Sequence, residues 1–208
     1  MLSGLLRPRE GRVLVDGVDV TRRTPQARAR LGLARTFQRL ELFGELTVRE
    51  HLVVAHRQGR RSPLARFARD LLGLGARPYP GEDDAVDATL ELLALDHLAN
   101  RPAATLGLGT GRLVELARAI AAGPRVLLLD EPSSGLDANE TAQLTDVLRR
   151  LRDERGIALV LVEHNVEMVL SLADRVTVLD FGEVIAEGTP PEIRQSAAVQ
   201  AAYLGTST

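Results

Sequence analysis

Apolar positions along this chain fall into short continuous runs and into longer stretches with helical spacing. Two of the runs are Val126 to Leu129 and Ile157 to Val162, and an acidic residue follows each of them. Such runs are typical of strands that are buried on both faces of a parallel sheet. Helical spacing is found before the first run, over Gly111 to Ala122, and after it, over Asn139 to Arg152. The alternation predicts an α/β fold with a mostly parallel sheet.

Shorter elements are predicted on both sides of this region. Thr47-Val48-Arg49-Glu50 fits the capping-box pattern and predicts that a helix opens at Thr47. Residues 59–84 are rich in Arg, Gly and Pro, which favours a variable insertion inside a helical subdomain. The other predictions are strands over 12–16 and 33–38, helices over 24–32, 85–95 and 166–172, and a hairpin of strands 176–179 and 184–186 around Phe181-Gly182.

The pattern divides the chain into three parts. Residues 1–46 would form the first part of an α/β core, and residues 47–122 a helical subdomain inserted into it. Residues 123–208 would complete the core and end in a short tail.

Composition excludes several classes of function. The 208 residues carry a net charge of −2 and only 3% aromatic residues, so neither a basic footprint nor a base-stacking surface for nucleic acid is present. The absence of cysteine excludes disulfides and thiolate metal sites, and fits a reducing cytoplasm. No apolar run approaches the roughly 20 residues needed to span a bilayer, so we expect any link to a membrane to go through a partner.

The strongest candidate for chemistry is the acidic pair at the end of the first apolar run. Asp130 and Glu131 follow Val126 to Leu129, and Ser134-Gly135-Leu136-Asp137 adds a turn and a further carboxylate. Strands of a parallel sheet deliver such residues to one edge, where a crevice can bind a ligand. Because side chains alternate at a strand end, one carboxylate can face a hydrated Mg²⁺ while the other faces an attacking water.

Three weaker candidates lie in separate loops. His164 follows the second buried strand and should emerge at the same edge as Asp130, where it could contact a phosphate or orient a water. Gln38 ends the predicted strand LARTFQ and could ligate Mg²⁺ or water. Leu106 to Thr110 (LGLGT) offers backbone N–H groups at a helix N-terminus, which is a ready anion site or else a plain linker. His51, His56 and His97 lie in the predicted helical subdomain and have no partner residues in the sequence that would indicate a site.

A phosphate-holding loop is the companion that this acidic site requires. Such a loop has the pattern Gly-x-x-x-x-Gly-Lys-Ser/Thr. The chain contains no such pattern and no lysine, since all 26 basic residues are arginine. Half of a nucleotide site is therefore present in the sequence.

Taken in order, these motifs resemble those of the ATP-binding cassette (ABC) ATPases, over essentially the whole chain. The stretches ARTFQ, LFGELTV, VEHN, VLDFGEVIAEGTP and AAYLG look like the subunits that power importers of branched-chain amino acids. The matching motifs are the Q-loop (Gln38), the signature (Leu106, Gly107, Leu108, Gly109, Thr110), Walker B (Val126 to Pro132), the D-loop (Ser134 to Asp137) and the switch histidine (His164).

The resemblance implies a P-loop NTPase-like fold with ATP and Mg²⁺ as cofactors. Glu131 would be the general base, Asp130 the carboxylate on the Mg²⁺ side, and His164 the sensor of the γ-phosphate. Gln38 would couple hydrolysis to transport and contribute to the metal site, and Asp137 would communicate across a dimer. The family implies a cytoplasmic protein on the inner face of the membrane. Its partners would be membrane permeases, a second ATPase subunit that is identical or different, and, indirectly, an external solute-binding protein.

The chain also departs from the family pattern. The usual signature LSGGQ is kept only at Leu106 and Gly109. Met1 to Pro8 resembles the end of the helix that follows the P-loop, so we expect an N-terminally truncated subunit with impaired ATP binding. The alternative is a non-hydrolysing partner subunit, against which the altered signature LGLGT argues. A cassette ATPase of DNA repair or translation is disfavoured by the small size and the absence of a basic arm.

Overall fold

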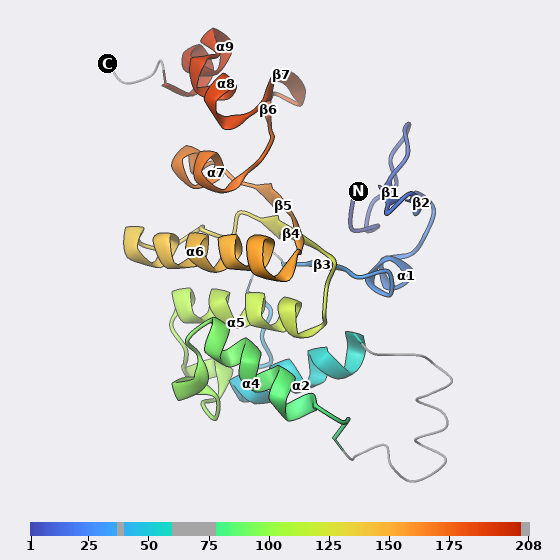
Figure 1. Ribbon diagram of the computed structural model, residues 1–208, viewed down its shortest axis with the longest axis vertical. Coiled ribbons are helices and arrows are strands. Elements are labelled where there is room, and N and C mark those ends of the chain that lie inside the picture. Colours follow the sequence, from blue (N-terminus) through green and yellow to red (C-terminus); the bar gives the residue numbers. More distant parts are fainter. Residues whose placement is uncertain (37–39, 60–77, 205–208) are drawn as a thin grey trace. The chain divides into compact units, whose positions relative to one another are not determined.

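Two compact units make up the structure, a computed structural model that describes residues 1–36, 40–59 and 78–204 (Figure 1). The first unit spans Met1–Val162 and the second spans Glu163–Thr208. The α/β architecture predicted from the sequence is confirmed. The predicted division into 1–46, 47–122 and 123–208 stays a prediction.

The first unit contains a parallel sheet, a small hairpin and most of the helices. The sheet has the order β3-β4-β5, and β1 pairs with β2 in an antiparallel hairpin. The strands are β1 (Leu14–Val15), β2 (Val18–Asp19), β3 (Leu33–Arg35), β4 (Val126–Asp130) and β5 (Ala158–Val162). The helices are α1 (Pro25–Ala29), α2 (Val48–Gly59), α4 (Glu82–Leu92), α5 (Leu108–Ala121) and α6 (Ala138–Arg155), with 3-10 turns η1 (Asp96–Leu98) and η2 (Ala103–Thr105).

The second unit contains a hairpin between short helices. β6 (Val176–Asp180) pairs antiparallel with β7 (Glu183–Gly188), as predicted from Phe181-Gly182. Phe181 and Gly182 both have positive φ, 45° and 86°, which suits a two-residue turn between strands. The helices are α7 (Val166–Leu172), α8 (Pro190–Gln195), α9 (Ala197–Val199) and the π-helical turn η3 (Gln200–Leu204).

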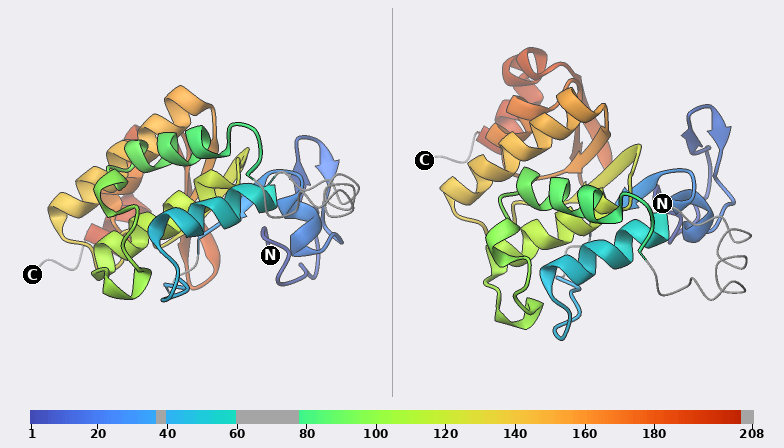
Figure 2. Two further views of the ribbon diagram at one scale, coloured as in Figure 1. Left: turned by 90° about the horizontal axis from the view of Figure 1, so that it is seen from below. Right: turned by 60° about the horizontal axis from the view of Figure 1, so that its bottom comes forward.

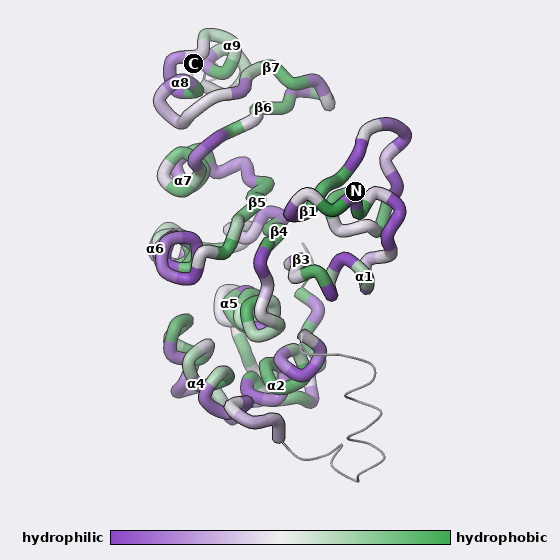
Figure 3. The backbone as a smooth tube through the Cα atoms, turned by 45° about the vertical axis from the view of Figure 1, so that its right-hand side comes forward, coloured by the Kyte–Doolittle hydropathy of each residue, from purple (hydrophilic) through white to green (hydrophobic). Residues whose placement is uncertain are grey.

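The central strand β4 positions the functional residues. β4 runs parallel to β3 and β5, with Leu127 opposite Leu159 and Asp130 opposite Val162. Leu127 and Leu129 are buried, and the half-buried acidic pair follows where the strand leaves the core. The backbone colours of Figure 3 show this hydrophobic stretch through β4 and β5. Asp130 is therefore delivered to the carboxyl edge of the sheet.

A helical layer is formed by α2, α4 and α5, which contact one another pairwise (Figure 2). Val48, Leu52, Val86 and Val114 are completely buried between these helices. The predicted capping box of α2 is present, because the Thr47 backbone N–H donates to Glu50 at 2.7 Å and the Glu50 N–H donates to Thr47 Oγ1 at 3.2 Å. No helix in the described part of the chain has the length and hydrophobicity needed to cross a membrane.

Several predicted element bounds were wrong. The strand predicted over 12–16 is reduced to β1, because Asp16 and Gly17 turn back with φ of 49° and 75°. The helix predicted over 24–32 ends at Ala29, ahead of Gly32 with φ of 86°. The helix predicted from Gly111 begins at Leu108. Most of the predicted insertion, residues 60–77, lies outside the described residues.

Candidate functional site

Asp130 ends β4 at the carboxyl edge of the sheet and already has a charged partner. The Arg35 guanidinium Nη2 donates to Asp130 Oδ2 at 2.9 Å. Arg35 is the last residue of β3, and its Nη1 also donates to Ser3 Oγ at 3.1 Å. The side chains of Arg35 and Asp130 expose 28% and 32% of their area, so this ion pair lies at a surface open to ligands.

Glu131 follows directly, in a backbone conformation that is costly for a residue with a side chain. Its φ is 45°, in the left-handed region. Its N–H donates to the Val162 carbonyl at 2.8 Å, and its carbonyl accepts from the Ser134 N–H at 3.1 Å. Non-glycine residues in this region cost on the order of 1–3 kcal/mol and cluster at functional sites. The two hydrogen bonds hold Glu131 half-buried beside Asp130 at the strand end.

An open pocket of about 170 Å³ lies at this edge of the sheet. Its polar groups are Ser3, Arg35 and Asp130. The rest of the lining is apolar and comes from the N-terminal segment, β4 and β5 (Met1, Leu2, Leu128, Leu129, Val160, Val162). The acidic residue that the sequence singled out therefore opens onto a pocket whose lining includes the ion pair of Arg35 and Asp130.

Asp137 caps the helix α6. Its Oδ1 accepts from the Glu140 N–H at 2.8 Å, while Glu140 Oε2 accepts from the Asp137 N–H at 3.0 Å. The two residues form a complete capping box, which fixes the turn between β4 and α6. The role of Asp137 across a dimer stays a prediction.

The segment Leu106 to Thr110, which the sequence predicts to be either an anion site at a helix N-terminus or a plain linker, contains the start of α5. α5 begins at Leu108, with Gly107 as its N-cap in extended conformation, and the Gly111 N–H donates to the Gly107 carbonyl at 2.9 Å. No side chain caps Gly107, so the N–H groups of the first turn still form a helix N-terminus. Anion binding at this segment stays a prediction.

Glu140 and Leu108 bring this helix start to the turn before α6. A Cβ placed on Gly109 would lie 2.1 Å from Glu140 Oε1, and one placed on Gly135 would lie 2.8 Å from Leu108 Cδ2. The structure thus packs the 106–110 segment against the Ser134 to Asp137 turn of the same chain.

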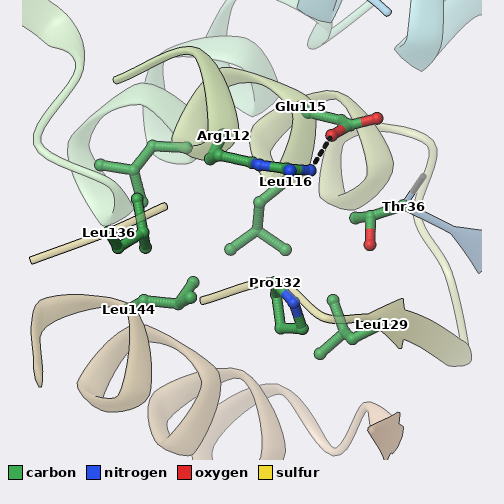
Figure 4. A pocket seen from close by; sticks show the side chains of 9 residues that line it. Thr36, Arg112, Glu115, Leu116, Leu129, Pro132, Leu136 and Leu144 are labelled. Atoms are coloured by element: carbon green, nitrogen blue, oxygen red, sulfur yellow. Dashed lines mark ion pairs between the residues drawn. The ribbon is translucent and has the colours of Figure 1, made fainter. Parts of the chain in front are cut away.

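A second, small pocket lies between α5 and the turn that follows β4 (Figure 4). Arg112 and Glu115 of α5 form an ion pair at 3.8 Å along it, and Pro132 lies across from them. The Thr36 hydroxyl lines the same pocket and is buried, with no hydrogen-bond partner among the described residues. This pocket lies where the segment after β3 and the turn after β4 pack against α5, between the sheet and the helical layer.

Two further candidates, His164 and Gln38, lie outside the described part of the first unit. His164 belongs to the second unit, where it is exposed, and its Nδ1 lies 3.7 Å from Glu163 Oε2. Its backbone N–H also donates to Glu163 Oε2, at 2.9 Å, just ahead of the Asn165 N-cap of α7. Gln38 lies outside the described residues. The convergence of both on Asp130 stays a prediction.

The donor set at the sheet edge suits Mg²⁺ bound mainly through phosphates. Mg²⁺ usually takes one or two protein carboxylates and completes its shell with water and phosphate oxygens. Asp130 offers one such carboxylate. Within the described ranges, no three His, Asp or Glu side chains are grouped to hold a metal on their own. Asp130 therefore fits the ion as a single ligand, once the ion pair with Arg35 is shared or opened.

Sequence reasoning missed two residues of this site, Arg35 and Glu140. Arg35 is 95 residues from Asp130 along the chain, and only the sheet order brings them together. Glu140 had a readable signal, because Asp137-x-x-Glu140 has the spacing of a capping box.

Comparison with known families gives two matches. Residues 1–134 match the family described as "ABC transporter". Residues 183–207 match the family described as "Branched-chain amino acid ATP-binding cassette transporter".

Individual relatives are similar in sequence to this chain over nearly its whole length. The high-affinity branched-chain amino acid transport ATP-binding protein BraF of Pseudomonas aeruginosa is 37% identical over 98% of this chain and 80% of BraF. The corresponding protein LivG of Escherichia coli K12 is 36% identical over 98% and 80%. The lipopolysaccharide export system ATP-binding protein LptB of Haemophilus influenzae is 30% identical over 99% and 78%.

Solved structures of ATP-binding cassettes are also similar to this chain. An ATP-binding cassette of an ABC transporter, MJ1267, is similar with a TM-score of 0.79 and 29% identity over 96% of this chain and 79% of that one. Its ADP conformation gives a TM-score of 0.77 at 29% identity, over 98% and 80%.

Proposed function

We propose a function from the premise that this chain belongs to the ABC transporter family of ATP-binding proteins. The chain is the subunit that energises an importer for branched-chain amino acids. It acts at the cytoplasmic face of the membrane as part of a dimer bound to permease subunits, with an external solute-binding protein as an indirect partner. The observation that carries this proposal is the Asp130-Glu131 pair at the carboxyl edge of the sheet.

The chemistry assigned to the chain's own residues is proton transfer and orientation. The Glu131 carboxylate accepts the proton of the water that attacks the terminal phosphate, and its backbone bonds to Val162 and Ser134 hold it in place. Asp130 holds Mg²⁺, which when bound neutralises phosphate charge. In this proposal His164 senses the γ-phosphate, Gln38 couples hydrolysis to transport, and Asp137 communicates with the second subunit.

The solute class rests on the C-terminal part of the chain and on the relatives. Residues 183–207 match the branched-chain amino acid family, and BraF and LivG carry that description. Deletion of the gene should abolish uptake of labelled leucine and leave uptake of labelled urea unchanged. Loss of urea uptake alone would contradict the assignment.

The 208 residues by themselves hold ATP weakly. They contain no lysine and no Gly-x-x-x-x-Gly-Lys-Ser/Thr pattern, so the hydrogen bonds of a phosphate loop are missing. Each charge-assisted hydrogen bond is worth roughly 1.5–3 kcal/mol, so losing several removes more than about 6 kcal/mol. That loss equals about four decades of affinity.

Calorimetric titration of ATP and Mg²⁺ into the purified chain tests this step. The expected result is no binding at millimolar ATP. A clear micromolar dissociation constant would contradict the proposal, because it would need phosphate ligands that the proposal does not include.

The alternative function is that of a non-hydrolysing partner in a heterodimer. The complete capping box at Asp137 and the open N-terminus of α5 favour it, since these are the parts that such a partner would present. The signature, reduced to Leu106 and Gly109, argues against it. Under this alternative, Glu131→Gln would leave the ATP hydrolysis of the dimer unchanged.

A further inference from the structure

The ion pair between Arg35 and Asp130 places the positively charged guanidinium at the carboxylate that would bind Mg²⁺ in the proposed site. Arg35 Nη2 lies 2.9 Å from Asp130 Oδ2, so the carboxylate is already neutralised by the chain itself. Among the described residues that line the pocket at this edge, Ser3 is the other polar one and Asp130 is the acidic one. A divalent ion that approaches the Asp130 carboxylate from this pocket therefore meets a neutral ion pair, with the Glu131 carboxylate as the neighbouring negative charge.

Both partners are positioned independently of each other. Asp130 is fixed by its register with Val162 on β5, and Arg35 by its register with Leu128 on β4. The guanidinium has a second partner, because its Nη1 donates to Ser3 Oγ at 3.1 Å. Arg35 could move off Asp130 and still keep a hydrogen bond, so the ion pair can open without leaving its charge unpartnered.

We propose that Arg35 is a positioning residue that competes with the divalent cation for Asp130. The guanidinium occupies the carboxylate in the absence of the ion, and it must move away or share Oδ2 before the ion binds. The inference rests on the proposed function only in taking Asp130 as the carboxylate on the metal side.

Mn²⁺ binding to the purified chain tests the competition, with free Mn²⁺ measured by electron paramagnetic resonance and no nucleotide present. Arg35→Gln removes the competing charge and should tighten Mn²⁺ binding by about tenfold, the size expected for removing one charge near a half-exposed site. Adding Asp130→Asn to Arg35→Gln should abolish this gain. Arg35→Lys keeps the charge and should bind Mn²⁺ as the unmodified chain does.

Arg125→Gln is the matched control. Arg125 forms an ion pair with Asp16 at 2.6 Å in the same unit, and both side chains are exposed. This change alters the net charge by the same amount and uncovers a carboxylate elsewhere, so it should leave Mn²⁺ affinity unchanged. Unchanged or weaker binding in Arg35→Gln would overturn the proposal, as would an equal gain in Arg125→Gln.

A measurement on the unmodified chain covers the case in which Arg35→Gln does not fold. The nuclear magnetic resonance signal of the Arg35 side-chain Nε–H should shift when Mg²⁺ is added. A Mg²⁺-dependent shift at the Asp130 amide without any change at Arg35 would overturn the proposal. Neither measurement uses ATP or a permease, so a failure of the importer function leaves these results readable.

Discussion

Glu140 Oε1 lies in the space that a side chain at Gly109 would need, 2.1 Å from the position of its Cβ. The other oxygen of this carboxylate accepts the Asp137 N–H at 3.0 Å. One side chain therefore touches both the start of α5 and the turn before α6. A side chain at position 109 would displace the Glu140 carboxylate, which also accepts the Asp137 N–H.

The first prediction concerns the same substitution at two glycines of this segment. Gly109→Ser should lower the free energy of unfolding by about 1 kcal/mol, because it displaces Glu140 and breaks the capping box of α6. Gly107→Ser should be neutral or slightly stabilising, because nothing lies within 4 Å of a Cβ there and serine is a better N-cap than glycine. Urea denaturation measures both.

A double-mutant cycle identifies the cause. In a Glu140→Ala background, Gly109→Ser should cost much less than it does alone, since the clashing carboxylate is gone. Equal costs in the two backgrounds would show that Glu140 is not the reason for the glycine.

The second prediction concerns the left-handed backbone at Glu131. Glu131→Gly should be more stable than Glu131→Ala by about 1 kcal/mol, because glycine adopts a φ of 45° without strain. Both variants lack the carboxylate, so the comparison isolates the backbone. Thermal unfolding gives the difference.

Gln143 supplies a control of opposite sign. It lies exposed within α6, where Gln143→Gly should be less stable than Gln143→Ala. An alanine variant at position 131 that is more stable than the glycine variant would contradict the strain.

The third prediction is a pH dependence from the buried ion pair that joins α2 and α4. Arg57 Nε and Nη2 donate to Glu82 at 2.7 and 2.8 Å, and the Glu82 side chain is 2% exposed. This hydrogen bonding, followed by the charge of Arg57, outweighs burial and lowers the pKa of Glu82 below its ordinary value of 4.5. A lowered pKa means that the folded state favours the carboxylate.

The stability that Glu82 contributes is therefore complete above about pH 4.5 and is lost as the pH falls through its lowered pKa. The stability difference between the unmodified chain and Glu82→Gln should be largest near pH 7 and shrink below pH 4.5. Urea denaturation across this range measures it. Asp87→Asn, which breaks the exposed pair with Arg49, should have a smaller effect at every pH. A pH-independent difference for Glu82→Gln would contradict the ion pair.

The parts of the fold that follow local rules could be predicted from the sequence. β4 and β5 were predicted as strands because their apolar runs have the length of a strand and end at acidic residues. The burial predicted for β4 is confirmed, whereas that predicted for β5 was wrong, because every residue of β5 is exposed or half-buried. The start of α2 followed from the Thr47 and Glu50 spacing. Asp130 and Glu131 were identified because they follow the apolar run of the buried strand β4.

The remainder depends on contacts between distant segments. The helix start at Leu108 was missed because Gly107, Gly109 and Gly111 have low helix propensity, whereas packing of Leu108 on Gly135 and of Gly109 on Glu140 favours it. The pairing of Arg35 with Asp130 depends on the order of strands in the sheet, which no local pattern reveals.

ATP hydrolysis by a fusion protein tests the central claim most directly. A strand, a Gly-x-x-x-x-Gly-Lys-Ser loop and its helix, taken from an ABC ATP-binding subunit, would be joined before Met1, and the rate compared with that of the unfused chain. The unfused chain should not hydrolyse ATP, the fusion should, and Glu131→Gln in the fusion should lower the rate at least about 100-fold, as expected for loss of a general base. A fusion that hydrolyses ATP equally well with Gln at position 131 would contradict the claim that this chain supplies the catalytic carboxylate of the ATP site.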